Sequence, residues 1–158
     1  MKRLILLLAM LGMFTVACEE GGIDEQNPID QPVSGEDEDE IIIPQNNIWY
    51  TTSYDTQIEL IVTEGLGGNL ISHTFEDGYG KIVFDNNVTA IPNEAFKDCA
   101  TLTSILLPNC VTTIGDYAFD GCSDLTSATI PDNVISIGTY AFAGCINITS
   151  VTIPGSVT

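Results

Sequence analysis

The sequence predicts a solenoid in which short β-strands and turns recur once per coil and successive coils stack on one another. A strict 23-residue period is the first observation, since Ile91, Ile114 and Ile137 recur in step and other apolar positions follow them. The second is a shift in composition, from a polar, acidic stretch over residues 18–46 to an apolar, periodic stretch that starts near Lys81. The third is an amino-terminal segment that is first basic and then apolar and leads to Cys18.

The repeating unit has the apolar spacing of a leucine-rich repeat, as Leu102, Ile105, Leu107, Val111 and Ile114 show in one copy. Residues at the same position in successive repeats, here called a column, include Ala95, Ala118 and Ala141, and Phe96, Phe119 and Phe142. Alternation over residues 104–107 predicts a short strand that ends at a proline, and residues 116–119 predict a turn or two of helix capped by an aspartate. Neither element can bury its apolar side within one repeat, so stacking is required.

The unit Ile-Gly-x-x-Ala-Phe-x-x-Cys-x-x-Leu resembles the 23-residue repeat of the BspA-like leucine-rich-repeat proteins over about residues 82–158. This resemblance implies a leucine-rich-repeat solenoid with a short β-strand plus a short helix or turn per coil, spanning 81–158 in about three repeats. It also implies a bacterial surface protein that binds other proteins without enzymatic activity. Residues 47–80 resemble the leader of such arrays and are expected to form an N-terminal β-rich cap.

Residues 1–17 have the features of an export signal, with Lys2 and Arg3 before an apolar run that is too short to span a bilayer. The stretch Thr15-Val16-Ala17-Cys18 resembles the lipobox of bacterial lipoproteins. That resemblance implies cleavage before Cys18 and acylation of its thiol. We therefore expect a lipid-anchored protein of the outer membrane, at the cell surface.

Charge excludes one class of partner. The chain has 22 Asp and Glu against 4 Lys and Arg, a formal net charge of -18, which disfavours nucleic acid. Residues 18–46 are expected to form a disordered acidic tether, extended by self-repulsion. Its acidic run at 36–40 lacks the glycine turn and the alternating ligands of a calcium-binding loop, so no calcium site is expected.

Outward-pointing strand residues form the predicted protein-binding face. They fall in two columns, Lys81, Ser104, Ser127 and Ser150, and Val83, Leu106, Thr129 and Thr152. This nearly uncharged floor, beside turns that carry several aspartates, suits a protein ligand better than a polyanion. The favoured function is an adhesin for host proteins. The alternative is a structural or accessory component of the outer envelope with no host ligand.

The cysteines Cys99, Cys122 and Cys145 share one column and are expected to be buried free thiols that satisfy backbone groups at a bend. No histidine shares that column, so neither zinc nor another metal is expected. Cys110 lies off the column and is the candidate for an exposed thiol. The single histidine, His73, and the absence of a nucleophile elbow or a phosphate-binding loop predict neither catalysis nor a cofactor.

Strands are predicted before the array at 48–52, 57–62, 69–75 and 81–84, with a hairpin turn at Asp77-Gly78. Trp49 and Tyr50 are expected to pack on the first coil, with a carbohydrate-stacking platform as the alternative. The last residues stop one position short of the next repeat start. The array is therefore expected either to continue in a longer chain or to self-associate through its open C-terminal end.

Overall fold

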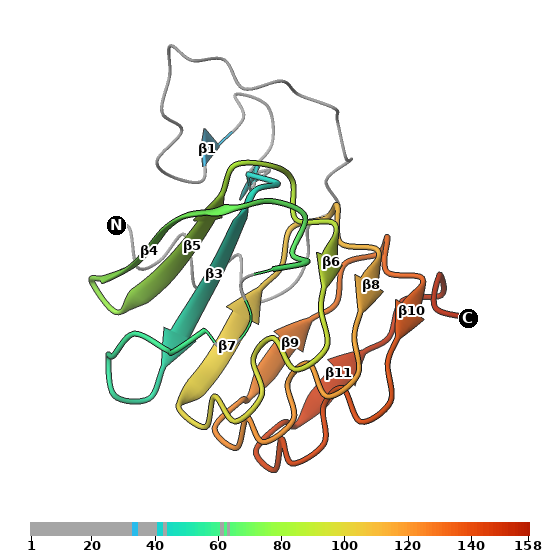
Figure 1. The fold of residues 1–158 in the computed structure, drawn as a ribbon. Helices are drawn as coiled ribbons and strands as arrows, with labels where there is room; N and C mark the ends of the chain where they lie inside the picture. The colour runs from blue at the N-terminus through green and yellow to red at the C-terminus, as the bar shows by residue number, and fades with distance from the viewer. Residues whose placement is uncertain (1–32, 35–40, 43, 61, 63) are drawn as a thin grey trace.

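The computed structural model describes residues 33–34, 41–42, 44–60, 62 and 64–158 of the chain (Figure 1). Strands β1 (Val33–Ser34) and β2 (Ile41–Ile42) pair antiparallel, within the segment predicted to be a disordered tether. Most of that tether, the export signal and Cys18 lie outside the described residues. Within the described ranges, no helix is long and apolar enough to cross a bilayer.

The 23-residue period becomes one coil of the chain. Strands β6 (Ala90–Ile91), β8 (Thr113–Ile114) and β10 (Ser136–Ile137) form a parallel sheet in the order β10-β8-β6. Ala90 and Ser136 both pair with Thr113, so each coil lies on the next in register. The predicted repeat period is confirmed.

The strands of the opposite side join a six-stranded sheet with the order β11-β9-β7-β3-β5-β4 (Figure 1). Its parallel part is made of β7 (Leu102–Leu106), β9 (Ser127–Thr129) and β11 (Ser150–Thr152), one from each repeat. Its antiparallel part is made of β3 (Asn47–Thr52), β4 (Leu70–Glu76) and β5 (Tyr79–Phe84). The two parts therefore share one continuous sheet.

Strand β3 lies between β5 and β7, which the sequence pattern does not predict. It runs antiparallel to both, with Trp49 paired to Lys81 on one side and to Leu106 on the other. The 23-residue spacing from Lys81 to Ser104 predicts that these two residues are neighbours. That prediction is wrong, because β3 separates the first strand of the period from the second.

The hairpin predicted at Asp77-Gly78 is confirmed. It joins β4 to β5, and both turn residues have positive φ, 53° at Asp77 and 84° at Gly78, as a two-residue type I′ turn requires. The strand predicted over 57–62 is wrong for the residues described there, since 57–60 and 62 are irregular.

The helix predicted at residues 116–119 is replaced by consecutive turns, as in the other repeats. Glu94, Tyr117 and Tyr140 have φ of 61°, 55° and 56°, which a right-handed helix does not tolerate. Backbone groups of these turns instead bond to the next coil, through Glu94 N to Asp116 O, Phe96 N to Ala118 O and Asp98 N to Asp120 O, at 2.9, 2.8 and 2.7 Å. Stacked coils thus supply the hydrogen bonds that a helix would supply locally.

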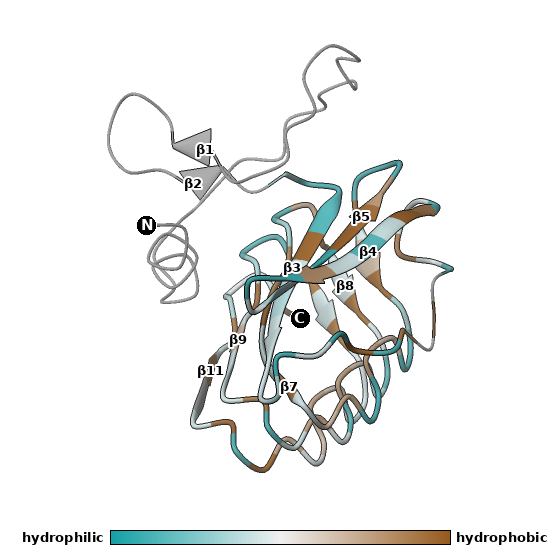
Figure 2. Cartoon of the chain, turned by 90° about the vertical axis from the view of Figure 1, so that its left-hand side faces the viewer, coloured by the Kyte–Doolittle hydropathy of each residue, from teal (hydrophilic) through white to brown (hydrophobic). Residues whose placement is uncertain are grey.

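The core runs the length of the stack. Figure 2 shows apolar positions interleaved with polar ones along the strands and turns of the coils. Phe96 and Phe119 are fully buried, with ring centroids 5.2 Å apart and planes within 1°, and Phe142 continues the stack at 5.1 Å. The adjoining alanine column is buried as well, so its small side chains permit the close approach of the coils.

Candidate protein-binding face

The outer face of the six-stranded sheet carries all of the predicted binding residues except Val83 in two rows. One row runs across the strands through Thr74, Lys81, Trp49, Leu106, Thr129 and Thr152. The other runs through Thr51, Ser104, Ser127 and Ser150. The antiparallel strand β3 therefore contributes Trp49 and Thr51 to a face on which the sequence pattern predicts only repeat residues.

Burial divides this face. Ser104 and Leu106 are only 8% and 5% exposed, so the prediction that they line a solvent-facing floor is wrong. Strand β3 is the physical reason, since Thr51 Oγ1 bonds to Ser104 Oγ at 2.6 Å and Trp49 is the register partner of Leu106. The accessible part lies on the last two repeats described.

Of the predicted residues on those two repeats, Thr129 and Thr152 are exposed and Ser127 is half-buried. Lys81 and Val83 are half-buried and lie on the far side of β3. The structure thus brings three of the predicted residues together in one accessible patch, which we call the strand face: Ser127, Thr129 and Thr152.

Trp49 and Tyr50 point to opposite faces of β3, as alternation in a strand requires. Tyr50 is fully buried in the core, whereas Trp49 is half-buried on the outer face. The Lys81 Nζ lies 5.2 Å from the centroid of the Trp49 ring, in a cation–π contact. One face of the indole is therefore already engaged by this chain.

Tyr50, which is buried, and His73, which is half-buried, form a polar pair. The Tyr50 hydroxyl and His73 Nε2 are 2.6 Å apart, and the Ile58 N–H donates to the same hydroxyl at 3.4 Å. Burial raises the pKa of Tyr50 to about 12, and burial lowers the pKa of His73 below its usual 6.5. His73 is the only histidine of the chain, so its titration can be isolated.

We expect His73 to make the stability of the fold depend on pH. The unfolded His73 takes up a proton near its usual pKa of 6.5, and the folded one only at lower pH. The contribution of His73 to stability is therefore complete above its unfolded pKa of 6.5. It is lost as the pH falls from there through the lower pKa of the folded state, because the unfolded state binds more protons. Urea denaturation at about pH 7.5 and about pH 5.5 should show a larger loss for the wild type than for His73→Gln. Equal losses in the two proteins would contradict the assignment.

The cysteine column is buried, and its three thiols are free. Cys122 Sγ donates to Phe96 O at 3.1 Å and Cys145 Sγ to Phe119 O at 3.2 Å, each carbonyl belonging to the preceding coil. Burial raises the pKa of Cys99 to about 11 and also raises the pKa of Cys122 and Cys145. These thiols therefore stay protonated at neutral pH and act as hydrogen-bond donors, not as nucleophiles.

Cys110 departs from the prediction of an exposed thiol. It is 8% exposed and is therefore buried. Its backbone N–H donates to Gln45 Oε1 at 3.0 Å, which ties the turn after β7 to the segment before β3. Within the described ranges, no group of three His, Cys, Asp or Glu side chains could hold a metal ion.

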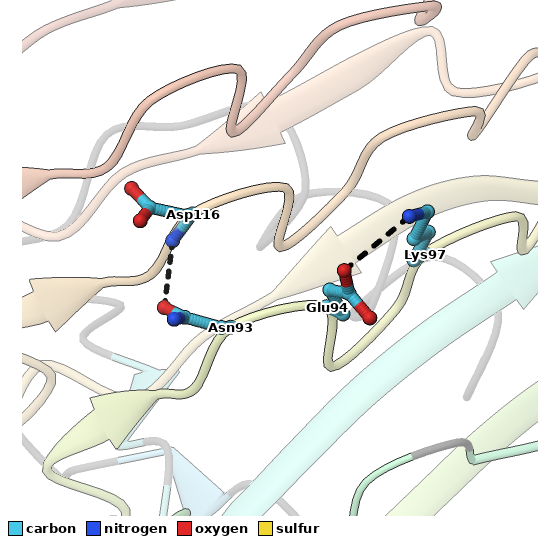
Figure 3. A network of polar contacts seen from close by, with 4 residues as sticks. All are labelled: Asn93, Glu94, Lys97 and Asp116. Atoms are coloured by element: carbon cyan, nitrogen blue, oxygen red, sulfur yellow. Dashed lines mark hydrogen bonds and ion pairs between the residues drawn. The ribbon is translucent and has the colours of Figure 1, made fainter.

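A polar ladder along the turns contains Asp116, one of the aspartates on the turns beside the predicted floor. The Asp116 N–H donates to Asn93 Oδ1 at 2.8 Å (Figure 3), and Asp116 Oδ1 accepts from the Thr139 N–H at 2.6 Å. The exposed tyrosines Tyr117 and Tyr140 lie beside this ladder. The predictions from the sequence do not include them as a candidate surface. The signal that could have identified them is their 23-residue spacing, which matches that of the core columns.

The fold and its faces define a class of protein, a repeat scaffold whose side chains are presented on stacked coils. Over residues 70–158 the chain matches the family described as the BspA type leucine rich repeat region, in 6 copies. The chain belongs to this family. Leucine-rich repeats suggest protein–protein interaction in general, and proteins of this family are typically non-enzymatic binding scaffolds.

Two solved structures are similar to this chain. A leucine-rich-repeat protein of T. pallidum, TpLRR, is 26% identical with a TM-score of 0.46, covering 69% of this chain and 52% of that one. A leucine-rich-repeat protein from Bacteroides capillosus is 23% identical with a TM-score of 0.45, covering 73% of this chain and 83% of that one. The chain therefore spans about half the length of the T. pallidum structure. No curated protein matches it.

Proposed function

We propose that the chain is a non-enzymatic surface lipoprotein of the bacterial outer membrane that binds protein partners and acts as an adhesin for host proteins. The observation that carries the binding role is the strand face, where exposed Thr129 and Thr152 lie side by side on parallel strands. Hydroxyl and methyl groups in such a row offer both hydrogen bonds and apolar contact, without a charge to desolvate. Membership of a repeat family whose members bind proteins supports the same role.

Anchoring is supported by the sequence around Cys18. A basic segment, an apolar run and the stretch Thr15-Val16-Ala17 precede this cysteine, in the order typical of a lipoprotein signal. Several acyl chains on one residue would hold the protein at the membrane stably, because a single chain binds only marginally. The acidic segment 18–46 would then separate the coils from the anionic membrane surface.

The anchor is tested by metabolic labelling with a palmitate analogue in a Gram-negative host. The wild type should carry label and fractionate with outer membranes, and Cys18→Ala should do neither. Mass spectrometry of the mature amino-terminal peptide should show diacylglycerol on Cys18. Equal label in both proteins, or a Cys18 recovered in a disulfide, would contradict the proposal.

The binding role is tested with Thr129→Arg/Thr152→Arg, which places two bulky charges on the strand face. The matched control is Ser136→Arg/Asn147→Arg, because both residues are exposed, lie outside the six-stranded sheet and add the same charge. Binding to immobilised host matrix proteins should fall only in the first variant. Wild-type protein that binds none of them but co-purifies with envelope proteins would favour the accessory role instead.

A further inference from the structure

Two tyrosines form an exposed ridge on the turn side of the coils. Tyr117 and Tyr140 occupy the same position in successive repeats, and their rings are stacked with centroids 5.4 Å apart and planes at 23°. They are 36% and 63% exposed, so burial in the core does not account for them. Both tyrosines lie in turns that connect a strand of one sheet to a strand of the other, outside the strands that carry the strand face.

The backbone makes tyrosine an unusual choice at both positions. Their φ values of 55° and 56° are left-handed, which glycine and asparagine adopt far more readily than an aromatic residue. Four residues later in each repeat, the left-handed positions are occupied by Gly121 and Gly144. Glu94 has the same conformation at the equivalent position of the preceding repeat, with φ of 61°, so the left-handed turn belongs to the repeat and the two aromatic side chains are what distinguishes the ridge.

The ridge already binds a cation from its own chain. Lys97 Nζ lies 5.3 Å from the centroid of the Tyr117 ring, and it is also paired with Glu94 Oε1 at 3.3 Å (Figure 3). The pKa of Lys97 is raised, first by the hydrogen bond with Glu94, then by the charges of Glu94, Asp120 and Asp98. Aromatic faces beside carboxylates are an environment suited to ammonium and guanidinium groups.

The turns that carry the ridge are held rigidly. The Tyr117 N–H donates to Thr139 O at 3.0 Å, and the Asn93–Asp116–Thr139 ladder fixes the residue before each tyrosine. A pre-organised surface loses little conformational entropy when a ligand binds. The backbone that carries the two rings is therefore already in place in the unbound protein.

We propose that the Tyr117–Tyr140 ridge and the carboxylates around it form a second binding surface, which takes lysine and arginine side chains from a basic segment of a partner protein. The cation over Tyr117 shows the contact geometry that the partner side chain would reproduce on the more exposed Tyr140 ring. The net charge of the chain, -18, attracts such a segment and repels an acidic one. This surface is separate from the strand face, so its failure would leave the proposed function standing.

The test measures binding of a fluorescein-labelled peptide of alternating lysine and glycine to the full-length chain by anisotropy. The variant Tyr117→Asn/Tyr140→Asn removes both rings, changes no charge and suits the left-handed backbone. We expect its dissociation constant to rise roughly two- to five-fold, as the loss of one exposed cation–π contact on the Tyr140 ring requires. The control Tyr54→Asn removes a tyrosine that is 74% exposed and lies off the ridge, and it should bind as the wild type does.

Circular dichroism checks the fold, and if the double variant unfolds, each single variant is measured instead. Equal affinity of the folded tyrosine variants and the wild type would overturn the inference. So would binding to a neutral oligosaccharide that exceeds binding to the peptide and is lost in the same variants, because the ridge would then be a sugar platform. Peptide binding lost only in Thr129→Arg/Thr152→Arg would place the basic segment on the strand face and would also overturn it.

Discussion

Phe119→Ala is expected to destabilise the stacked coils strongly. The Phe119 ring is fully buried and lies between Phe96 and Phe142, at centroid distances of 5.2 and 5.1 Å. Its removal leaves a cavity in the middle of the stack, which neighbouring rings cannot fill without losing their own contacts. The free energy of unfolding should fall by about 3–5 kcal/mol, a large share of the total for a small domain.

Urea denaturation followed by Trp49 fluorescence and by circular dichroism measures this effect. The control is Tyr54→Ala, because Tyr54 is 74% exposed and should change stability by no more than about 0.5 kcal/mol. A loss below about 1 kcal/mol for Phe119→Ala would mean that the phenylalanine stack does not hold the coils together.

Gly80→Ala is expected to destabilise the antiparallel part of the sheet more than any other substitution that adds a single methyl group there. A Cβ on Gly80 would overlap the Tyr50 ring at Cζ, Cε1 and Cε2. Tyr50 is fully buried and bonded to His73, so the ring cannot move aside without breaking that pair. Overpacking of this kind should cost about 3 kcal/mol or more.

The matched control is Gly155→Ala, whose added Cβ would meet no atom within 4 Å. Thermal denaturation should leave that variant close to the wild type and lower the midpoint for Gly80→Ala by several degrees. In a Tyr50→Leu background the penalty of Gly80→Ala should largely vanish, because the clashing ring is gone. A penalty that persists unchanged would assign it to the backbone of β5 and not to Tyr50.

The repeat could be predicted because the contacts that build it recur at a fixed separation. Phe96, Phe119 and Phe142 are neighbours in space for the same reason that they are aligned in sequence, since one coil takes 23 residues. The buried alanine and cysteine columns follow from the same periodicity. The hairpin at Asp77-Gly78 is predictable too, because that dipeptide favours the left-handed conformations that a tight turn needs.

The helix predicted over residues 116–119 does not form, for a reason that local helix propensity cannot reveal. Asp116 is a favoured N-cap residue, yet the Tyr117 and Phe119 N–H groups donate to Thr139 O and Ala141 O of the next coil. A repeat in isolation could not make those bonds. The left-handed conformation of Tyr117 is therefore a property of the stack.

The sequence by itself determined the period, the inward columns and the family, because each is a local pattern repeated along the chain. Only the tertiary structure decided where β3 lies, since Thr51 meets Thr103 and Ser104 across 52 and 53 residues and no periodic signal encodes such a pairing. The position of β3 between β5 and β7 buries Ser104 and Leu106 and confines the strand face to Ser127, Thr129 and Thr152. Pairing between strands that are far apart in the sequence depends on which strand edges the complete fold leaves unpaired. The sequence of a single repeat does not contain that information.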